Sequence, residues 1–444
     1  MYTYVKKALA LLALTMLLMC LGGCSLQFGD GLLLLPKVPA EYVQLQQQLN
    51  QILQNGASYA VAETGTNRQA VQLMDLDGDG AEEALAFFRT DAGAYQVYAF
   101  RQEAGIYTRI GMAEGYGTTL RAIYYPTLGD GRSGLAMCWG FDEGGSYGMT
   151  VYDFTEDGMT VLLDMQYADV VIEDIDGNGA QEMAFAVRDS ITGLYSARVY
   201  QFRRNEYRVL YEVAMCLEVR SVASMRFGHL GGNQVGLYID SLATTGGYVT
   251  DVIWYDGRMA ANCTIDQASG SGSRTWRQSS VFCADVNDDG QIDVPVNHVF
   301  SRETNETEVR SRLDWKNYNL LGEETQVSAT LHAAGENWYL LWPDSWGEQV
   351  HVDKSNGVGL AQTECYLQSA DGQRETLFTV YVFTGSGREE AAALYRTLQP
   401  LAANAYGLYR CRLPENSHSE LVPDVETVKS LFRTIEVSWN AEEY

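Results

Sequence analysis

The stretch DLDGDGAEE, residues 75–83, decides the fold because two close copies of it follow along the chain. The copies are DIDGNGAQE at 174–182 and DVNDDGQID at 285–293. A short apolar stretch precedes each copy and another follows it, so we expect each copy to be a loop that joins two β-strands. The copies begin 99 and 111 residues apart. This spacing is about twice the length of a four-stranded propeller blade, which predicts a further unit in each gap.

A weaker copy lies in each gap. The segments 126–131 and 227–232 keep glycines of the loop and lead into apolar strands, but they lack most of the acidic residues. Aligned on their last glycines, the five units start 51, 48, 53 and 58 residues apart. We therefore predict a mostly β chain containing a β-propeller of about five detectable blades, with residues 58–63 as a strand that closes the ring. Separate small sandwiches are the alternative, but about 50 residues bury too little surface to fold alone. Within the first unit, four strands are expected at 71–74, 84–88, 95–101 and 107–112.

The acidic residues of the loops have the spacing of a metal site. Side chains at positions 1, 3, 5 and 9 offer oxygen, position 7 offers a backbone carbonyl, and the glycine at position 6 permits a sharp turn. A flexible cage of oxygen ligands suits Ca²⁺ better than Mg²⁺. An EF-hand is excluded, because position 12 is Ala86, Phe185 or Val296 and not a bidentate Glu. The expected side-chain ligands are Asp75, Asp77, Asp79 and Glu83, then Asp174, Asp176, Asn178 and Glu182, then Asp285, Asn287, Asp289 and Asp293, with carbonyls from Ala81, Ala180 and Gln291.

The loops, the strands beside them and the period of about 50 residues resemble the FG-GAP or VCBS repeats of integrin-like calcium-binding β-propellers. The resemblance covers residues 58–330. It implies a propeller with its calcium loops on one face and a binding or adhesion role without chemistry of its own. The second and fourth units depart from the pattern at their ligand positions, so we expect them to bind no metal.

The first 23 residues have the pattern of a bacterial signal peptide. Two lysines precede an apolar run of twelve residues, 8–19, which is shorter than the ~18 to 20 residues of a spanning helix. The run ends in Leu-Gly-Gly-Cys, which resembles a lipobox and implies that Cys24 becomes a lipidated N-terminus. An ordinary signal peptide or an uncleaved anchor is the alternative. We therefore expect an exported protein, anchored by lipid at the outer face of the cell membrane, with a stalk and helix in residues 24–57.

The composition narrows the classes of partner. The 444 residues include 31 Lys and Arg against 57 Asp and Glu, a formal charge of -26. Nucleic-acid binding needs clustered cations and is therefore not expected. Without residues 1–23 the charge is -28, so we expect anionic lipid to repel the body of the protein while the lipid anchor holds it.

Residues 336–444 no longer follow the repeat and predict a small α+β domain. Strands are expected at 338–342, 350–352, 361–367, 377–383 and 406–413. A helix at 387–398 would be capped by Ser386 with Glu389, and Asp424 would cap a second helix. The tryptophans of this region, Trp338, Trp342, Trp346 and Trp439, suit either a sugar-stacking platform or ordinary core packing.

Six cysteines remain after the signal peptide and Cys24 are set aside. An exported location permits disulfides, and Cys365 with Cys411 is the first pair to consider, whereas six buried free thiols are the alternative. The six are Cys138, Cys216, Cys263, Cys283, Cys365 and Cys411.

The sequence contains no convincing catalytic motif. The only GxSxG match, at 144–148, falls in a hairpin loop, whereas a nucleophile elbow requires a strand, a sharp turn and a helix. We therefore expect a binding or scaffold module for a protein or carbohydrate ligand and not an enzyme. The alternative is a surface-attached enzyme that acts on polysaccharide, with its site on the propeller face or between the domains.

Overall fold

The computed structural model describes residues 42–129, 131–141, 146–155, 158–231, 234–299, 311–369, 372–415 and 419–435. The signal peptide, Cys24, the stalk and Trp439 lie outside the described residues. The chain divides into two compact units, one of residues 1–56 with 102–108 and the other of residues 57–101 with 109–444. Within the described part, no helix has the length and apolar character needed to cross a membrane.

The smaller unit contains the predicted N-terminal helix. Helix α2 spans Val43–Gln54 and buries Leu45 and Leu49, which lie one turn apart on the same face. The side chain of Gln48 donates a hydrogen bond of 2.6 Å to the carbonyl oxygen of Tyr107. The structure therefore contains the helix expected within residues 24–57. Its packing on a propeller blade stays a prediction.

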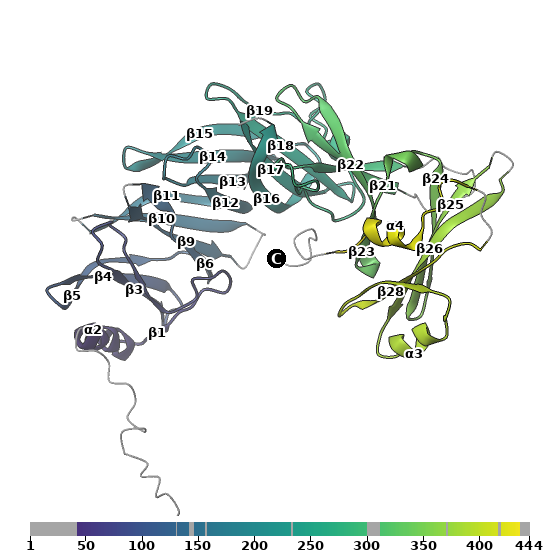
Figure 1. Cartoon of the computed structure of the whole chain (residues 1–444). Coiled ribbons are helices and arrows are strands. Elements are labelled where there is room, and N and C mark those ends of the chain that lie inside the picture. The colour runs from purple at the N-terminus through teal and green to yellow at the C-terminus, as the bar shows by residue number, and fades with distance from the viewer. Residues whose placement is uncertain are drawn as a thin grey trace, which may run out of the picture. The chain divides into compact units, whose positions relative to one another are not determined.

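In the larger unit, the described residues form five successive antiparallel sheets, each following its strands in chain order (Figure 1). This meander of about four strands is the topology of a propeller blade. The predicted class, a mostly β chain of four-stranded blades, is therefore confirmed. The strands of these sheets are β2 (Val71–Met74), β3 (Glu83–Thr90), β4 (Tyr95–Glu103) and β5 (Ile106–Glu114); β6 (Thr119–Tyr124), β9 (Leu135–Gly140), β10 (Tyr147–Thr155) and β11 (Gly158–Tyr167); β12 (Asp169–Glu173), β13 (Glu182–Arg188), β14 (Tyr195–Arg203) and β15 (Glu206–Ala214); β16 (Val219–Gly231), β17 (Gln234–Ala243), β18 (Tyr248–Tyr255) and β19 (Ala260–Asn262); and β20 (Val294–Val299), β21 (Ser311–Tyr318), β22 (Glu324–Ala333) and β23 (Trp338–Leu341).

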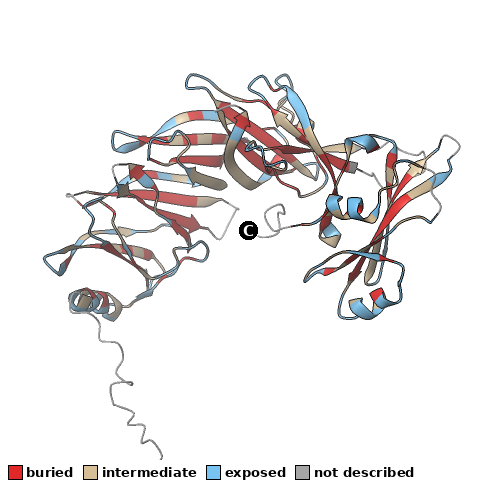
Figure 2. Cartoon of the chain, in the orientation of Figure 1, coloured by how far each residue is buried: buried red, intermediate tan, exposed pale blue. Residues whose placement is uncertain are grey.

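Each sheet shares a hydrophobic core with the next sheet along the chain. Phe87 of the first sheet belongs to the same buried cluster as Met137 of the second, and Cys138 of the second belongs to the same cluster as Phe185 of the third. The middle strands are the most buried ones, as Figure 2 shows. Because both faces of a middle strand are covered, its sequence is a continuous apolar run, as in residues 84–88.

Two sequence-based expectations for the blades are wrong. Strand β1 (Ala57–Tyr59) pairs with β3 in the first sheet, whereas the Glu63 N–H donates to Leu120 O of the second sheet at 3.0 Å, so residues 58–63 do not form a single ring-closing strand. The apolar stretch before the third loop forms isolated bridges and no strand, and one of these bridges joins Ala284 to Asp293. The physical reason is that the backbone N–H of Cys283 donates to the Asp240 side chain, at 3.0 Å, and not to a neighbouring strand.

The C-terminal region adds a sixth sheet and two short helices. Strands β23 and β29 (Phe432–Thr434), both expected in a separate domain, extend the fifth sheet by pairing next to β22. The domain boundaries themselves stay predictions. The sixth sheet consists of β24 (Val350–Gly357), β25 (Leu360–Gln368), β26 (Arg374–Thr384), β28 (Gly407–Arg412) and β27 (Gln399–Ala403), in that order.

The two helices differ in how well the sequence predicted them. Helix α4 (Val425–Leu431) is capped as expected, because the Asp424 carboxylate accepts a hydrogen bond of 2.7 Å from the Thr427 N–H. Helix α3 (Arg388–Ala393) is shorter than expected, and its N-cap is Gly387 without a side-chain hydrogen bond. The capping box that Ser386 would supply is therefore absent.

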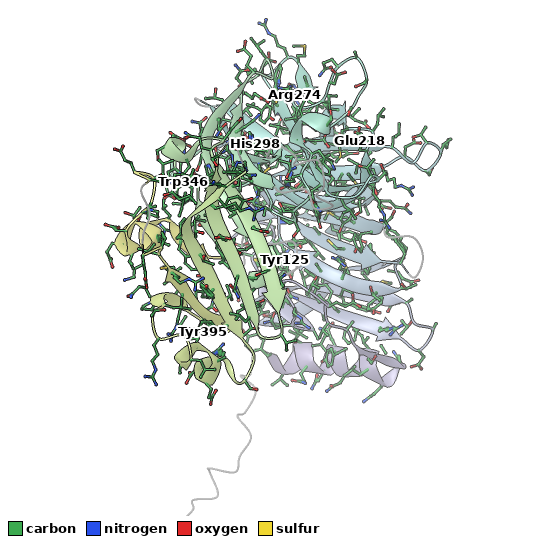
Figure 3. All side chains as sticks on the ribbon, turned by 90° about the vertical axis from the view of Figure 1, so that its right-hand side faces the viewer. Tyr125, Glu218, Arg274, His298, Trp346 and Tyr395 are labelled. Atoms are coloured by element: carbon green, nitrogen blue, oxygen red, sulfur yellow. The ribbon has the colours of Figure 1, made fainter. Side chains whose placement is uncertain are left out.

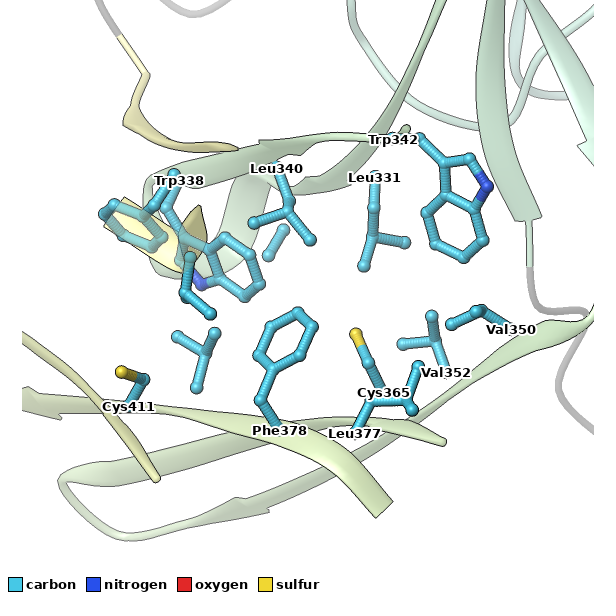
Figure 4. Packing of buried hydrophobic residues seen from close by; sticks show 14 of the residues in the cluster. Leu331, Trp338, Leu340, Trp342, Val350, Val352, Cys365, Leu377, Phe378 and Cys411 are labelled. Carbon is cyan, nitrogen blue, oxygen red and sulfur yellow. The ribbon is translucent and has the colours of Figure 1, made fainter. Parts of the chain in front are cut away.

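All six of these cysteines are buried free thiols, so the alternative without disulfides is confirmed and the candidate pair Cys365 and Cys411 is not bonded. Cys365 lies opposite Phe378, and Cys411 lies opposite Val380, so β26 separates the two thiols. Two strand spacings amount to about 10 Å, which exceeds the ~7 Å between Cα atoms that a disulfide can bridge. Both side chains instead enter the core between the fifth and sixth sheets (Figure 4).

The described tryptophans of the C-terminal region are core residues and not a surface platform. Trp338, Trp342 and Trp346 are all buried in the cluster shared by the fifth and sixth sheets. The rings of Trp342 and Trp346 meet edge to face with their centroids 5.2 Å apart, the arrangement that aromatic quadrupoles favour.

Candidate metal centres

Each of the first two acidic loops connects the two strands of a β-hairpin. The first loop joins β2 to β3, where Met74 pairs with Glu83. The second loop joins β12 to β13, where Glu173 pairs with Glu182. Because the strands pair up to the ends of each nine-residue stretch, its first and last acidic side chains start close together. Local strand pairing therefore gathers residues that are eight positions apart.

The first loop is held by its own carboxylates. Asp75 accepts hydrogen bonds from the N–H groups of Gly78, at 2.9 Å, and Gly80, at 3.0 Å. Asp79 accepts one of 2.7 Å from Ala81. These bonds turn the carboxylates inward, with Gly80 at a φ of 88° that suits glycine.

The second and third loops repeat this scaffold. Asp174 accepts from the Gly179 N–H at 2.9 Å, and Asp285 accepts from the Gly290 N–H at 2.8 Å. The third loop differs at position 4, where Asp288 adopts a φ of 59° in place of a glycine. Aspartate tolerates this left-handed conformation better than most residues, so the loop keeps its shape.

The acid at position 9 is the buried element of each site. Glu83, Glu182 and Asp293 are fully buried, and each accepts a hydrogen bond of 2.9 to 3.0 Å from the N–H at position 2 of its loop. Among the described residues, the second carboxylate oxygen of Glu83 and that of Asp293 accept no hydrogen bond. A buried carboxylate oxygen without a hydrogen bond is unfavourable, so Asp293 Oδ1 favours a cation beside it, whereas Glu83 Oε1 already lies 3.5 Å from the Arg101 guanidinium.

Burial also shifts the ionisation of these acids. It raises the pKa of the Glu83 and Glu182 carboxyls, although the backbone hydrogen bonds at position 2 oppose the shift. Burial raises the pKa of Asp293 to about 6, with Asp289 and Asp285 adding to the rise. In each case an empty loop disfavours the charged form, which a bound cation would restore.

The expected ligands are brought together to different degrees. Ligand oxygens of Asp75, Asp77 and Glu83 lie within 4.8 Å of one another, and so do those of Asp174, Asp176 and Glu182. Within the described part of the chain, the third loop forms no such group of three acidic residues. Asn287 stands there at position 3, and its amide donates to Asp289 at 3.0 Å.

The loop of the second unit contains an ion pair where the others have acidic ligands. Arg132 Nη1 lies 3.1 Å from an oxygen of the buried Asp153. This loop also contacts the acidic loops on either side, because the Ser133 N–H donates to Leu76 O at 3.0 Å. Thr127 O likewise accepts from the Gln181 N–H at 2.8 Å. The loops of these neighbouring units therefore adjoin, which supports the expectation of loops gathered on one face.

Three residues beside these sites were not predicted from the sequence. They lie on the strand after the ligand strand, at the position that the strand register, continued by one residue, sets opposite position 9, and they are Arg101, Gln201 and Asn317. Their distances along the chain from the first aspartate differ, at 26, 27 and 32 residues. A fixed motif therefore cannot find them, and only the strand register does.

His298 of the fifth sheet lies among acidic side chains and an arginine. His298 Nδ1 lies 3.1 Å from Asp314, whose other oxygen accepts from Arg312 at 2.8 Å (His298 is labelled in Figure 3). His298 Nε2 lies 3.8 Å from the exposed Glu348. The contact between His298 and Asp314 ties β20 to β21.

No protein-family model matches the chain, and no curated protein matches its sequence. Among solved structures, it is similar to Saccharomyces cerevisiae Sqt1, at 12% identity and a TM-score of 0.32, over 82% of this chain and 97% of that one. It is also similar to the β-propeller domain of the Trilobed protease from Pyrococcus furiosus, at 10% identity and a TM-score of 0.28, over 72% of this chain and 93% of that one. The exotype rhamnogalacturonan lyase YesX matches at 13% identity and a TM-score of 0.29, over 80% of this chain and 72% of that one.

Proposed function

We propose that the protein is a calcium-stabilised β-propeller of the FG-GAP or VCBS type that acts as a binding module at the bacterial cell surface. The observation that carries the calcium assignment is the shared construction of the three loops. Each loop turns its aspartates inward with backbone hydrogen bonds and ends in a fully buried acid. An Asp/Gly-rich turn without a ligand would not need that buried charge.

The donor set fits calcium. The three loops supply four, three and three carboxylates from the positions proposed as ligands, and no thiolate or imidazole is among them. Oxygen ligands of this kind hold a hard cation, and the irregular cage suits the larger shell of Ca²⁺. The bound ion would neutralise acidic groups that otherwise repel one another.

The stoichiometry of calcium binding tests the assignment. Asp75→Ala and Asp174→Ala should each remove about one bound ion, because each deletes the residue that orients its loop. Asp130→Ala is the matched control and should remove none, since that loop lacks the other acidic ligands. Equilibrium dialysis of the full chain with metal analysis gives the count. An equal loss from all three variants would contradict the assignment.

The N-terminal cysteine provides a separate prediction about location. We propose that a lipid on Cys24 is the membrane anchor, because the body of the protein carries a net charge of -28 and would be repelled by anionic lipid. Cys24→Ala should leave the protein unprocessed or shed into the medium. Detergent phase partitioning of cells expressing either form measures this. A cleaved mutant that remains wholly in the detergent phase would show that the anchor lies elsewhere.

The ligand of the module is proposed to be an extracellular protein or a carbohydrate. A glycan array probed with the calcium-loaded protein, followed by a hydrolysis screen on every hit, separates binding from catalysis. Retention without turnover supports the binding module. Turnover of a bound polysaccharide would favour the alternative, a surface-attached enzyme.

A further inference from the structure

We infer that the residue opposite position 9 on the neighbouring strand sets the calcium affinity of each loop, and that Arg101 makes the first loop the weakest of the three. This inference rests on the proposed calcium binding. It adds a residue outside the loop motif to each site and ranks the sites by that residue.

The strand register places the three residues at one structural position. Ala84 pairs with Phe100, which sets Glu83 beside Arg101. Met183 pairs with Tyr200, which sets Glu182 beside Gln201. In the fifth sheet, Val294 pairs with Lys316, and one step further along the same register Asn317 comes beside Asp293. The position is therefore occupied by an arginine, a glutamine and an asparagine in turn.

Arg101 already contacts two of the proposed ligands of the first loop. Its Nη2 lies 2.7 Å from Asp77 Oδ2, and its Nε lies 3.5 Å from Glu83 Oε1. The side chains are 14% exposed for Arg101, 19% for Asp77 and 1% for Glu83. Solvent therefore screens this charge cluster only weakly.

Gln201 makes the same two contacts without a charge. Its amide nitrogen donates to Asp176 Oδ2 at 2.8 Å and to Glu182 Oε1 at 3.0 Å. The two loops thus have one geometry, with a guanidinium in one and a neutral amide in the other. This pair of sites forms an internal comparison, although position 5 also differs, with Asp79 in the first loop and Asn178 in the second, and the exposed Arg203 lies 4.0 Å from Asp176.

The third site has an amide with an unused acceptor. The side-chain oxygen of Asn317 accepts no hydrogen bond among the described residues, and neither does Oδ1 of the buried Asp293. The strand register puts these two residues opposite each other, and two acceptor oxygens without donors suit a cation. Asn317 is therefore assigned as an additional oxygen ligand, which compensates for the absence of an acid at Asn287.

The chemistry of the three side chains explains the ranking. A guanidinium has five donors and no acceptor, and it stays protonated, so it cannot ligate calcium and repels the ion electrostatically. A glutamine or asparagine amide can turn its oxygen toward the ion. Calcium must displace Arg101 from Asp77 and Glu83 before it gains those oxygens, whereas Gln201 only has to rotate.

The second unit shows that this fold accepts an arginine in the place of an ion. Arg132 comes from the loop and Asp153 from the strand beside it, next to Gly134 at position 9. The charges are reversed between loop and strand relative to Glu83 and Arg101. In the first unit the arginine comes from the strand and the acid ends the loop, whereas in the second unit the arginine comes from the loop region and the acid from the strand.

Calcium titration calorimetry on the full chain tests the inference. To isolate the first loop, the titrations use the Asp174→Ala/Asp285→Ala background. There, Arg101→Gln should strengthen calcium binding at least about tenfold, which corresponds to about 1.4 kcal/mol. In the Asp75→Ala/Asp285→Ala background, the reciprocal Gln201→Arg should weaken the second site by at least about the same factor. Arg198→Gln, which removes the same charge from an exposed pair with Glu212, is the control and should change neither site.

The outcomes separate this inference from the proposed function. Calcium binding that is equally strong with Arg101 and with Gln at that position would overturn the inference and leave the calcium sites intact. The absence of calcium binding in the unmodified protein would overturn the proposed function itself. If Arg101→Gln fails to fold, as circular dichroism would show, the Gln201→Arg variant provides the test. An unchanged calcium affinity of its second site would overturn the inference.

Discussion

Replacing Asp240 by Ala is expected to lower the free energy of unfolding by about 3 to 5 kcal/mol, because it leaves a buried guanidinium without its counter-ion. Arg277 and Asp240 form an ion pair of 2.7 Å, with side chains 0% and 1% exposed. Asp240 also accepts from the Thr250 hydroxyl at 2.6 Å and from the Cys283 N–H at 3.0 Å. The carboxylate therefore ties the irregular segment before the third loop to the fourth sheet.

Urea denaturation of the full chain, followed by tryptophan fluorescence, measures this loss. The matched control is Glu212→Ala, which breaks the pair between Arg198 and Glu212, with side chains 31% and 43% exposed. A surface pair of this kind contributes about 0 to 1 kcal/mol. Equal midpoints for the two variants would show that the buried pair does not stabilise the fold as proposed.

Removal of calcium is expected to lower the melting temperature by several degrees. If each site binds with a Kd of ~0.1 mM, ~1 mM calcium contributes about 1.4 kcal/mol per site and roughly 4 kcal/mol for three sites. This is a large share of a typical stability of about 5 to 15 kcal/mol. The physical origin is the repulsion among the acidic groups of each empty loop, together with the buried acid at position 9.

A calorimetric scan in calcium and a second scan in EGTA measure the shift. The control is the triple variant Asp75→Ala/Asp174→Ala/Asp285→Ala, whose melting temperature should not respond to EGTA. An unmodified protein whose transitions are the same in both scans would show that the loops are only turns.

The loops were predictable because the residues that form each one are close together in the sequence. Asp75 and Glu83 lie within nine residues, and the turn between them is encoded by Gly78 and Gly80. The strands at either side follow from uninterrupted apolar runs, and four of them appear in the first sheet close to their expected bounds. The Asp424 cap was predictable for the same reason, since its partner Thr427 is three residues away.

The features that the sequence did not predict are contacts between segments that lie far apart in the sequence. Strand β29 joins β23, although 90 residues separate Leu341 from Phe432, and no local pattern specifies that pairing. The sequence left open whether Cys365 and Cys411 form a disulfide, and the structure excludes it because β26 lies between them, which is a property of strand order and not of composition.

The sequence by itself determined the repeat, the strand-forming segments and the acidic side chains of each loop, because these depend on spacing along a few residues of chain. Only the tertiary structure decided what faces each loop from the next strand: Arg101 in the first sheet and Gln201 in the third. The lengths of the hairpin turns and the β-bulges set that register, and they differ from unit to unit. A residue that controls the charge of a site can therefore lie at no constant distance from it in the sequence.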